Sequence, residues 1–237
     1  MAGLGRKVFT AGDVLTASDV QNYLMDQSVM YFAGTAARSS AIATPTTGMT
    51  TYIGTTGTAT IPQIEVYTGS AWQTPYGSTL VANVSFTAAG SIALDNVFTS
   101  TYTNYVALVN ITTSSATANH TLNYRASGAT NSTANYFYGA VAIVYGSSTV
   151  QGSQQSSATG VAEGSRADSG APSITTYTFA FPQVASKTYS QAFTVDSSVT
   201  RQVGTLFNAT TQFDGFVLTA QSGTITGNIR VYGIRNS

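Results

Sequence analysis

The sequence has no cysteine and very little charge. Nine Lys and Arg balance nine Asp and Glu among 237 residues, so charged side chains make up only 8% of the chain. Without cysteine there is no disulfide and no thiolate metal site. A net charge of zero gives no electrostatic attraction to phosphate backbones or anionic lipid, so we expect no nucleic-acid partner. Ser and Thr, roughly 28% of the chain, take the place of the missing charges.

Long hydrophobic runs are also missing. No apolar stretch reaches the roughly 18 residues that a membrane-spanning helix needs, so no membrane insertion is expected. Arg6 and Lys7 are not followed by the apolar segment of a secretory signal, and we therefore expect synthesis in a cytoplasm. A net charge near zero does little to keep copies apart. The composition thus suits a subunit of an assembly, and we expect a homotrimer.

The sequence offers little for catalysis or for binding a cofactor. His120 is the only histidine, and a metal site or catalytic triad would need further partners around it, so we expect a surface or structural role. Beyond residue 80 the acidic residues are Asp95, Glu163, Asp168, Asp196 and Asp214. Glycoside hydrolysis needs two of them held on a rigid scaffold. We expect no enzyme, no metal and no cofactor; the alternative is a depolymerase whose acids meet between subunits.

The N-terminal residues predict a short helix. Thr16 suits an N-cap with Asp19 three residues further on, close to a capping box. Apolar residues then recur at helical spacing, which predicts a helix over residues 17–27. Its narrow apolar stripe either packs on its own domain or meets other copies around a symmetry axis. The candidate attachment or oligomer contacts are Val20, Tyr23 and Leu24.

A small β-meander is expected after this helix. Residues 29–33 form an extended run, and a second helical turn follows through the letters AARSS before Pro45. Alternating residues between 48 and 72 predict short strands separated by glycine turns. Trp72, the only tryptophan, is expected to be the hydrophobic plug of this meander rather than a ligand platform.

A composition break at residues 73–79 predicts two domains. Pro75 and Gly77 lie there without apolar periodicity, so we expect a module at residues 1–74, a linker at 75–79 and a second domain at 80–237. The second domain should be an antiparallel β-sandwich of jelly-roll type, which makes the fold class mainly β. Its predicted strands are 80–87, 91–94, 105–112, 120–125, 136–144, 174–181, 190–195 and 204–207.

The last stretch, 214–234, carries the clearest β pattern. Alternating apolar residues on both sides of Ser222 and Gly223 predict two strands joined as a β-hairpin. A lone hairpin is marginal in water, so its apolar face requires a second sheet. The stretch is therefore the strongest single indication of a sandwich.

Residues 146–170 predict a long polar loop of low complexity. Such a loop either touches a partner or is a solvated insertion, and the composition favours neither. Tyrosines nearby suit sugar stacking or a subunit interface, but for most of them a structural use within the sandwich is favoured. The candidate host or partner contacts are Tyr136, Tyr138, Gln151, Gln154, Gln155 and Arg166.

One resemblance adds to these inferences. The ordered segments are KVFTAGDVLTASDVQNYLMDQSVMYFAGTAARSSAI, PTTGMTTYI and EVYTGSAW, within residues 7–72. They resemble the opening module of minor tail and fibre proteins of tailed bacteriophages that infect actinobacteria. The C-terminal half resembles the β-sandwich tips of such fibres more loosely, through FTSTYTNYVALVNI and GNIRVYGI.

The resemblance implies a structural virion protein assembled into the phage particle. The N-terminal module would attach the chain to other virion proteins, and the exposed sandwich would bind a host-surface carbohydrate. The alternative is a capsid decoration or head-fibre protein whose contacts are all structural. Both are non-enzymatic, and both place the protein in the virion.

Overall fold

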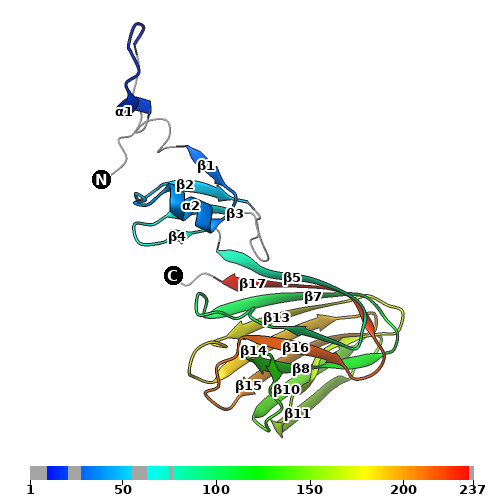
Figure 1. Cartoon of the computed structure of the whole chain (residues 1–237). Helices are drawn as coiled ribbons and strands as arrows, with labels where there is room; N and C mark the ends of the chain where they lie inside the picture. The colour runs from blue at the N-terminus through cyan, green and yellow to red at the C-terminus, as the bar shows by residue number, and fades with distance from the viewer. Residues whose placement is uncertain (1–9, 21–27, 55–62, 75–76, 235–237) are drawn as a thin grey trace. The chain divides into compact units, whose positions relative to one another are not determined.

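The computed structural model describes residues 10–20, 28–54, 63–74 and 77–234, and every element below belongs to these ranges. The chain is mainly β, as predicted (Figure 1). It divides into two compact units, Met1–Gly77 and Ser78–Ser237, which are described separately. The division falls within the stretch 75–79 that the composition singled out.

The first unit is built on a small four-stranded sheet. Strand β1 runs parallel to β2, and the pairs β2–β3 and β3–β4 are antiparallel. β2, β3 and β4 therefore form the antiparallel meander predicted between residues 48 and 72, and β1 adds a parallel strand at its edge. Its elements are α1 (Ala17–Asp19), β1 (Val29–Phe32), α2 (Thr35–Ala41), β2 (Thr50–Ile53), β3 (Gln63–Tyr67) and β4 (Trp72–Gln73).

The predicted capping box is present at the start of α1. The Asp19 backbone N–H donates to Thr16 Oγ1 (3.2 Å), and the Thr16 N–H donates to the Asp19 carboxylate (3.2 Å). Val20 follows as the C-cap and is half-buried. The rest of the predicted helix, with Tyr23 and Leu24, lies outside the described residues.

Trp72 packs within the sheet of the first unit. Its ring lies 5.3 Å from that of Tyr67, and the Arg38 guanidinium stacks 4.7 Å above it. Arg38 also forms a buried ion pair with Glu65 of β3. The Arg38 side chain therefore joins α2 to the sheet.

The second unit is an antiparallel sandwich of two sheets. The larger sheet has the strand order β11-β10-β15-β14-β13-β7-β17-β5, and the smaller one has β12-β8-β16-β6 with β9 beside β8. The strands are β5 (Ser78–Ala89), β6 (Ser91–Leu94), β7 (Asn104–Ser114), β8 (Ala118–Ala126), β9 (Ala129–Thr130), β10 (Tyr136–Val144), β11 (Val150–Ala158), β12 (Val161–Ala167), β13 (Ser173–Ala180), β14 (Thr188–Val195), β15 (Val199–Phe207), β16 (Gly215–Ala220) and β17 (Ile225–Ile234).

The predicted hairpin at 214–234 is wrong, although both of its strands exist. β16 pairs with β6 and β8 in the smaller sheet, whereas β17 pairs with β5 and β7 in the larger one. The turn at Gly223, whose φ is 69°, carries the chain from one sheet to the other. Facing sheets bury the apolar residues of both strands against each other, which a hairpin exposed on one face would not do.

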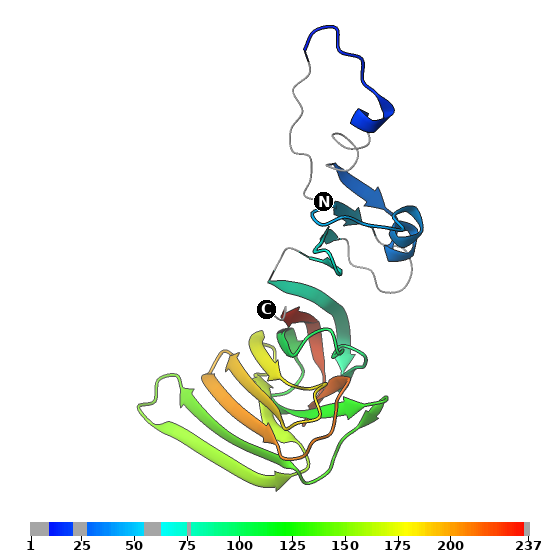
Figure 2. The same cartoon turned by 90° about the vertical axis from the view of Figure 1, so that its left-hand side faces the viewer.

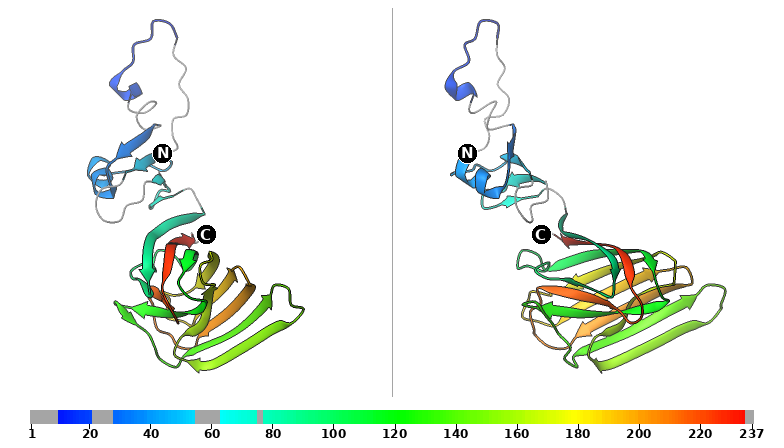
Figure 3. Two further views of the ribbon diagram at one scale, coloured as in Figure 1. Left: turned by 90° about the vertical axis from the view of Figure 1, so that its right-hand side faces the viewer. Right: turned by 45° about the vertical axis from the view of Figure 1, so that its right-hand side comes forward.

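Three chain connections between consecutive strands lead from one sheet to the other and lie side by side. β5 continues into β6, β7 into β8 and β16 into β17, and the crossing segments bond to one another. The Ala220 N–H donates to the Gly90 carbonyl (2.9 Å), and the Gln221 N–H donates to the Asn119 carbonyl (3.0 Å). β5 and β17, the first and last strands of the unit, are thus neighbours in the larger sheet (Figure 3, β5 teal and β17 red), and β6 and β16 are neighbours in the smaller one.

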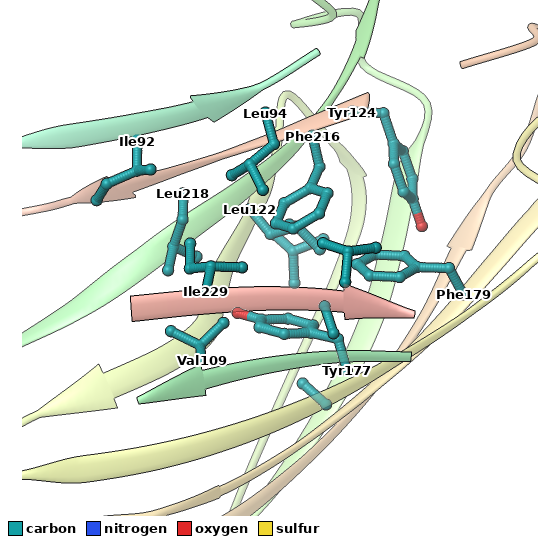
Figure 4. Packing of buried hydrophobic residues seen from close by; sticks show 14 of the residues in the cluster. Ile92, Leu94, Val109, Leu122, Tyr124, Tyr177, Phe179, Phe216, Leu218 and Ile229 are labelled. Carbon is teal, nitrogen blue, oxygen red and sulfur yellow. The ribbon is translucent and has the colours of Figure 1, made fainter. Parts of the chain in front are cut away.

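The core lies between the two sheets and is rich in aromatic rings. Figure 4 shows Phe216 and Leu218 of the smaller sheet facing Phe179, Tyr177 and Ile229 of the larger one. The rings of Phe179 and Phe216 lie 5.2 Å apart. This apolar contact fixes which face of each sheet points inward, and so it also decides which residues point outward.

The predicted polar loop at 146–170 is wrong, because most of it forms β11 and β12. β11 is an edge strand whose residues are almost all exposed, so its sequence has no apolar alternation. β12 is the edge of the other sheet, and it buries Val161, Gly164, Ser165 and Ala167, which are small or polar apart from the valine. Apolar periodicity cannot detect either kind of strand.

Candidate binding face

The outer face of the larger sheet is the side turned away from the smaller sheet, and Figure 2 shows its strands fanned out side by side. Burial alternates along β10, β13 and β14, so every second side chain points outward. Cross-strand partners share a face, which extends the same assignment to β11 and β15. We call the outward positions of these five strands the outer face.

Large apolar side chains lie exposed on the outer face. They come from four strands and remain between 47% and 61% accessible to solvent. Single apolar residues are normal on a protein surface, but several on one face of a sheet mark a candidate interaction site. The members of this set are Val141, Ile143, Val150, Ile174, Tyr189 and Phe193. Ile143 and Val150 are direct cross-strand partners.

Charge is absent from the outer face within the described strands. Its polar positions are glutamines and threonines. Arg201 belongs to β15, but its guanidinium turns toward the smaller sheet, where it donates to Asn119 (2.8 Å) and pairs with Glu163 (3.4 Å). The surface can therefore offer apolar area and neutral hydrogen bonds, but no ion pair.

A hollow of about 590 Å³ lies on this face over β10, β11 and β15. Two glycines that are direct cross-strand partners, Gly139 and Gly204, lie in its floor. Phe137 and Leu206, also partners, line one side. Gln154 is the partner of Gly139 on β11, and Gln191 is the partner of Gly204 on β14, so an amide stands at each end of the glycine pair.

The structure places the three predicted glutamines on β11 rather than in a loop. Gln151, Gln154 and Gln155 are exposed on this edge strand. Gln154 and Gln155 line the hollow, and Gln151 does not.

The two tyrosines predicted as contacts are buried. Tyr136 has no exposed surface, and its hydroxyl accepts a hydrogen bond from the Tyr124 N–H (2.9 Å) while donating to the Asn131 carbonyl (2.9 Å). Tyr138 is 8% exposed. Burial raises the pKa of both hydroxyls, that of Tyr136 to about 12. Inward-pointing positions of a sandwich strand face the core, and both side chains belong to the buried cluster. Tyr138 is also one of the residues that line the hollow, whereas Tyr136 is not.

Arg166 is held in an ion-pair network and is not a free contact. Its guanidinium reaches Asp196 (2.5 Å) and Asp168 (2.7 Å), which lie after β14 and after β12. Burial opposes ionisation of Asp168, but hydrogen bonds from Ser197 and Ser198 and the charge of Arg166 outweigh it and lower its pKa. The network ties β12 to the end of β14, and a partner would have to break it to reach Arg166.

His120 is buried rather than exposed. It lies on β8 without accessible surface, and its Nδ1 is 2.8 Å from Ser165 Oγ on β12. Its Nε2 has no hydrogen-bond partner among the described residues. Burial lowers its pKa to about 4, so the imidazole is neutral at physiological pH. Within the described ranges no group of three or more His, Asp or Glu residues could hold a metal ion.

The sequence analysis missed the glycines in the floor of the hollow. Gly204 was expected at a strand start, but β15 begins at Val199 and places Gly204 in mid-strand. Isolated glycines inside strands are a known signal for close approach by another group. That signal was present in both strands, yet only the register shows that Gly139 and Gly204 are neighbours.

No family model and no curated protein matches this chain. One solved structure found by fold comparison is a variant of a fructofuranosidase from Schwanniomyces occidentalis complexed with fructosylnystose. It is 7% identical, with a TM-score of 0.21, and the match covers 79% of this chain but 39% of that one, so this chain spans less than half of that protein's length. A TM-score this low does not indicate a shared fold. Among the described helices, none is long and apolar enough to cross a membrane.

Proposed function

We propose that the chain is a non-enzymatic structural protein of a tailed-phage virion, of fibre or minor-tail type, whose sandwich binds a neutral carbohydrate on the host surface. The observation that carries the binding role is the outer face, which combines exposed apolar side chains with glutamines and threonines and has no charge in the described strands. Neutral glycans are recognised by such surfaces, through apolar contact and uncharged hydrogen bonds.

The N-terminal segment supports the virion part of the proposal. Residues 7–72 resemble the attachment module of fibre-type proteins, and the first unit would join the chain to other virion proteins. Self-association as a homotrimer fits a chain with little charge to keep copies apart.

A second candidate is a capsid decoration or head fibre with structural contacts only. Val141, Ile143 and Val150 favour it, because aliphatic side chains about half exposed or more suit permanent burial against another protein. The two candidates differ in the partner of the outer face, and both place the protein in the virion.

An adsorption assay separates the two candidates. Purified full-length protein should bind cells of a strain that the parent phage infects, and it should compete with phage adsorption. Because no ion pair is available on the outer face, a tenfold rise in salt should change this binding less than about twofold. Binding to the capsid of particles that lack the protein, without affinity for cells, would favour the decoration role instead.

A further inference from the structure

The glycine pair in the hollow has no structural explanation. Gly139 and Gly204 are exposed and lie in mid-strand. Neither is one of the described glycines with a positive φ. A Cβ built on Gly204 would meet nothing within 4 Å, and one on Gly139 would meet only the Ser153 carbonyl at 4.0 Å. Glycine weakens a strand interior, and two of them opposite each other also forgo a side-chain pair. Their effect is to leave an open floor of backbone.

The surroundings of this floor define its chemistry. Gln154 and Gln191 stand at its two ends, about 14 Å apart at three strand spacings of about 4.8 Å. Each glutamine amide offers two donors and an acceptor. Phe137 and Leu206 form one apolar wall, and Val141 with its partner Gln202 follows on the other side. Tyr189 and Phe193 flank Gln191 along β14.

We infer that the Gly139–Gly204 floor is a subsite for the neutral hexose units of a glycan; this inference rests on the proposed function. A hexose presents apolar C–H faces together with hydroxyls that both donate and accept. The floor and the apolar walls suit the C–H faces, and the two glutamine amides suit the hydroxyls. The outward positions of the described surrounding strands carry no charge, which excludes recognition of anionic sugars by ion pairing there.

The size of the hollow fits a small ligand better than a second copy of the chain. About 590 Å³ lies within the range of small-molecule sites. A stable interface between proteins buries at least about 1,000 Å², whereas this floor is only two residues wide. An extended oligosaccharide can span the distance between the two glutamines.

Valine substitutions test the subsite because they fill the floor without a clash. Gly139→Val and Gly204→Val place side chains in open space on β strands, where valine is favoured, so both variants should fold with an unchanged or raised Tm. Gly152→Val is the matched control, since Gly152 is an exposed glycine on β11 with nothing within 4 Å and does not line the hollow.

The probes are the methyl glycosides of glucose, galactose and mannose, with N-acetylneuraminic acid as the anionic comparison. Saturation-transfer NMR on the full chain should detect binding of at least one neutral glycoside, weakened at least about tenfold by Gly139→Val or Gly204→Val and unchanged by Gly152→Val. Equal binding by wild type and both floor variants would overturn the subsite, as would preference for the anionic sugar or failure of all neutral glycosides to bind wild type.

Two further results separate this inference from the proposed function. If the floor variants still bind cells and compete with phage as wild type does, the subsite is wrong and the function stands. If wild type binds neither cells nor glycosides, the host-binding function fails together with the subsite. A change in the mass of Gly204→Val by light scattering would assign the floor to contact between copies and overturn the sugar assignment.

Discussion

At the scale of single residues, buried polar groups connect separate strands and loops of the sandwich. The Tyr136 hydroxyl joins the Tyr124 backbone to the Asn131 carbonyl, and its ring stacks on that of Tyr124 with centroids 5.8 Å apart. His120 on β8 lies opposite Ser165 on β12, and its Nδ1 is 2.8 Å from Ser165 Oγ. Such groups are costly to leave without partners, so small changes at these positions should have large effects.

Removing the Tyr136 hydroxyl should destabilise the sandwich. Tyr136→Phe keeps the ring but leaves the buried Tyr124 N–H and Asn131 carbonyl without this partner, which should cost about 1–3 kcal/mol in the free energy of unfolding. Tyr189→Phe is the control, because Tyr189 is 47% exposed and should change stability by less than about 0.5 kcal/mol. Urea unfolding of both variants measures the difference; equal midpoints would contradict the structural role of Tyr136.

Acid should destabilise the protein through His120. Its folded-state pKa of about 4 lies below the ordinary value of 6.5, so the unfolded chain binds a proton more readily between these values. Stability is therefore retained above pH 6.5 and falls as the pH drops toward 4, by about 2 kcal/mol between pH 7 and pH 5.

His120→Gln tests this dependence because glutamine does not titrate. Urea unfolding between pH 7 and pH 5 should lose most of its slope in the variant, whatever the variant's stability at pH 7. Asp168, whose pKa is lowered, affects stability only at more acidic pH, which keeps the two effects apart. An unchanged slope in His120→Gln would mean that another group takes up the proton.

At the scale of elements, the architecture is set by consecutive strands that belong to opposite sheets. β16 and β17 are adjacent in sequence but belong to opposite sheets, each between two strands distant in the chain. β6 lies beside β16, and Ser91 Oγ is 3.0 Å from Thr219 Oγ1 across that pair. A hairpin would instead pair Thr219 with a residue of β17 across the turn at Gly223.

Engineered cysteines can distinguish these two arrangements in a chain that has none of its own. Ser91→Cys with Thr219→Cys should form a disulfide under mild oxidation, because directly opposed residues of an antiparallel pair have suitably close Cβ atoms. Thr219→Cys with Thr226→Cys is the matched control, which only a hairpin would bring together. Mass spectrometry of the oxidised proteins shows whether the disulfide has formed in each variant. A disulfide in the control variant alone would contradict the two-sheet assignment.

At the scale of the whole molecule, the sandwich contains its own core. Among the described residues, the buried cluster draws only on the second unit, from Ile92 to Val231. A domain with its own core can fold independently when its boundary falls in a linker. The two units therefore allow stability and self-association to be tested separately.

The fragment 78–237 should fold and remain soluble without the first unit. Its urea midpoint for loss of β-sheet circular dichroism should match that of the same transition in the full chain, because the core contacts are the same. Limited proteolysis of the full chain should release it by cleavage near residues 75–76. An insoluble fragment, or one with a much lower midpoint, would show that the sandwich depends on residues 1–77.

Light scattering tests the proposed trimer. The full chain should have three times the monomer mass of 24.6 kDa, and the fragment 78–237 should show whether the contacts lie in the sandwich or in the first unit. Salt should affect the mass little, because the chain has few charges. A full chain that stays monomeric at high concentration would remove the trimer from the proposed function.

The sequence by itself determined the local structure. Alternation of apolar residues located most strands of the sandwich, and Thr16 with Asp19 fixed the capping box, because these signals depend only on neighbours in the chain. The sequence alone did not predict β11 and β12, because their residues are polar or small and their strand conformation depends on pairing with β10 and β8.

Only the tertiary structure decided which residues meet and which face outward. The assignment of β16 and β17 to opposite sheets follows from the mutual burial of their apolar faces, a long-range effect that local alternation cannot express. The same packing turns Tyr136 inward and leaves Phe193 at the surface, although both lie in strands of similar pattern. Register then places Gly139 beside Gly204, and this pairing of distant strands, rather than either glycine alone, creates the floor of the candidate site.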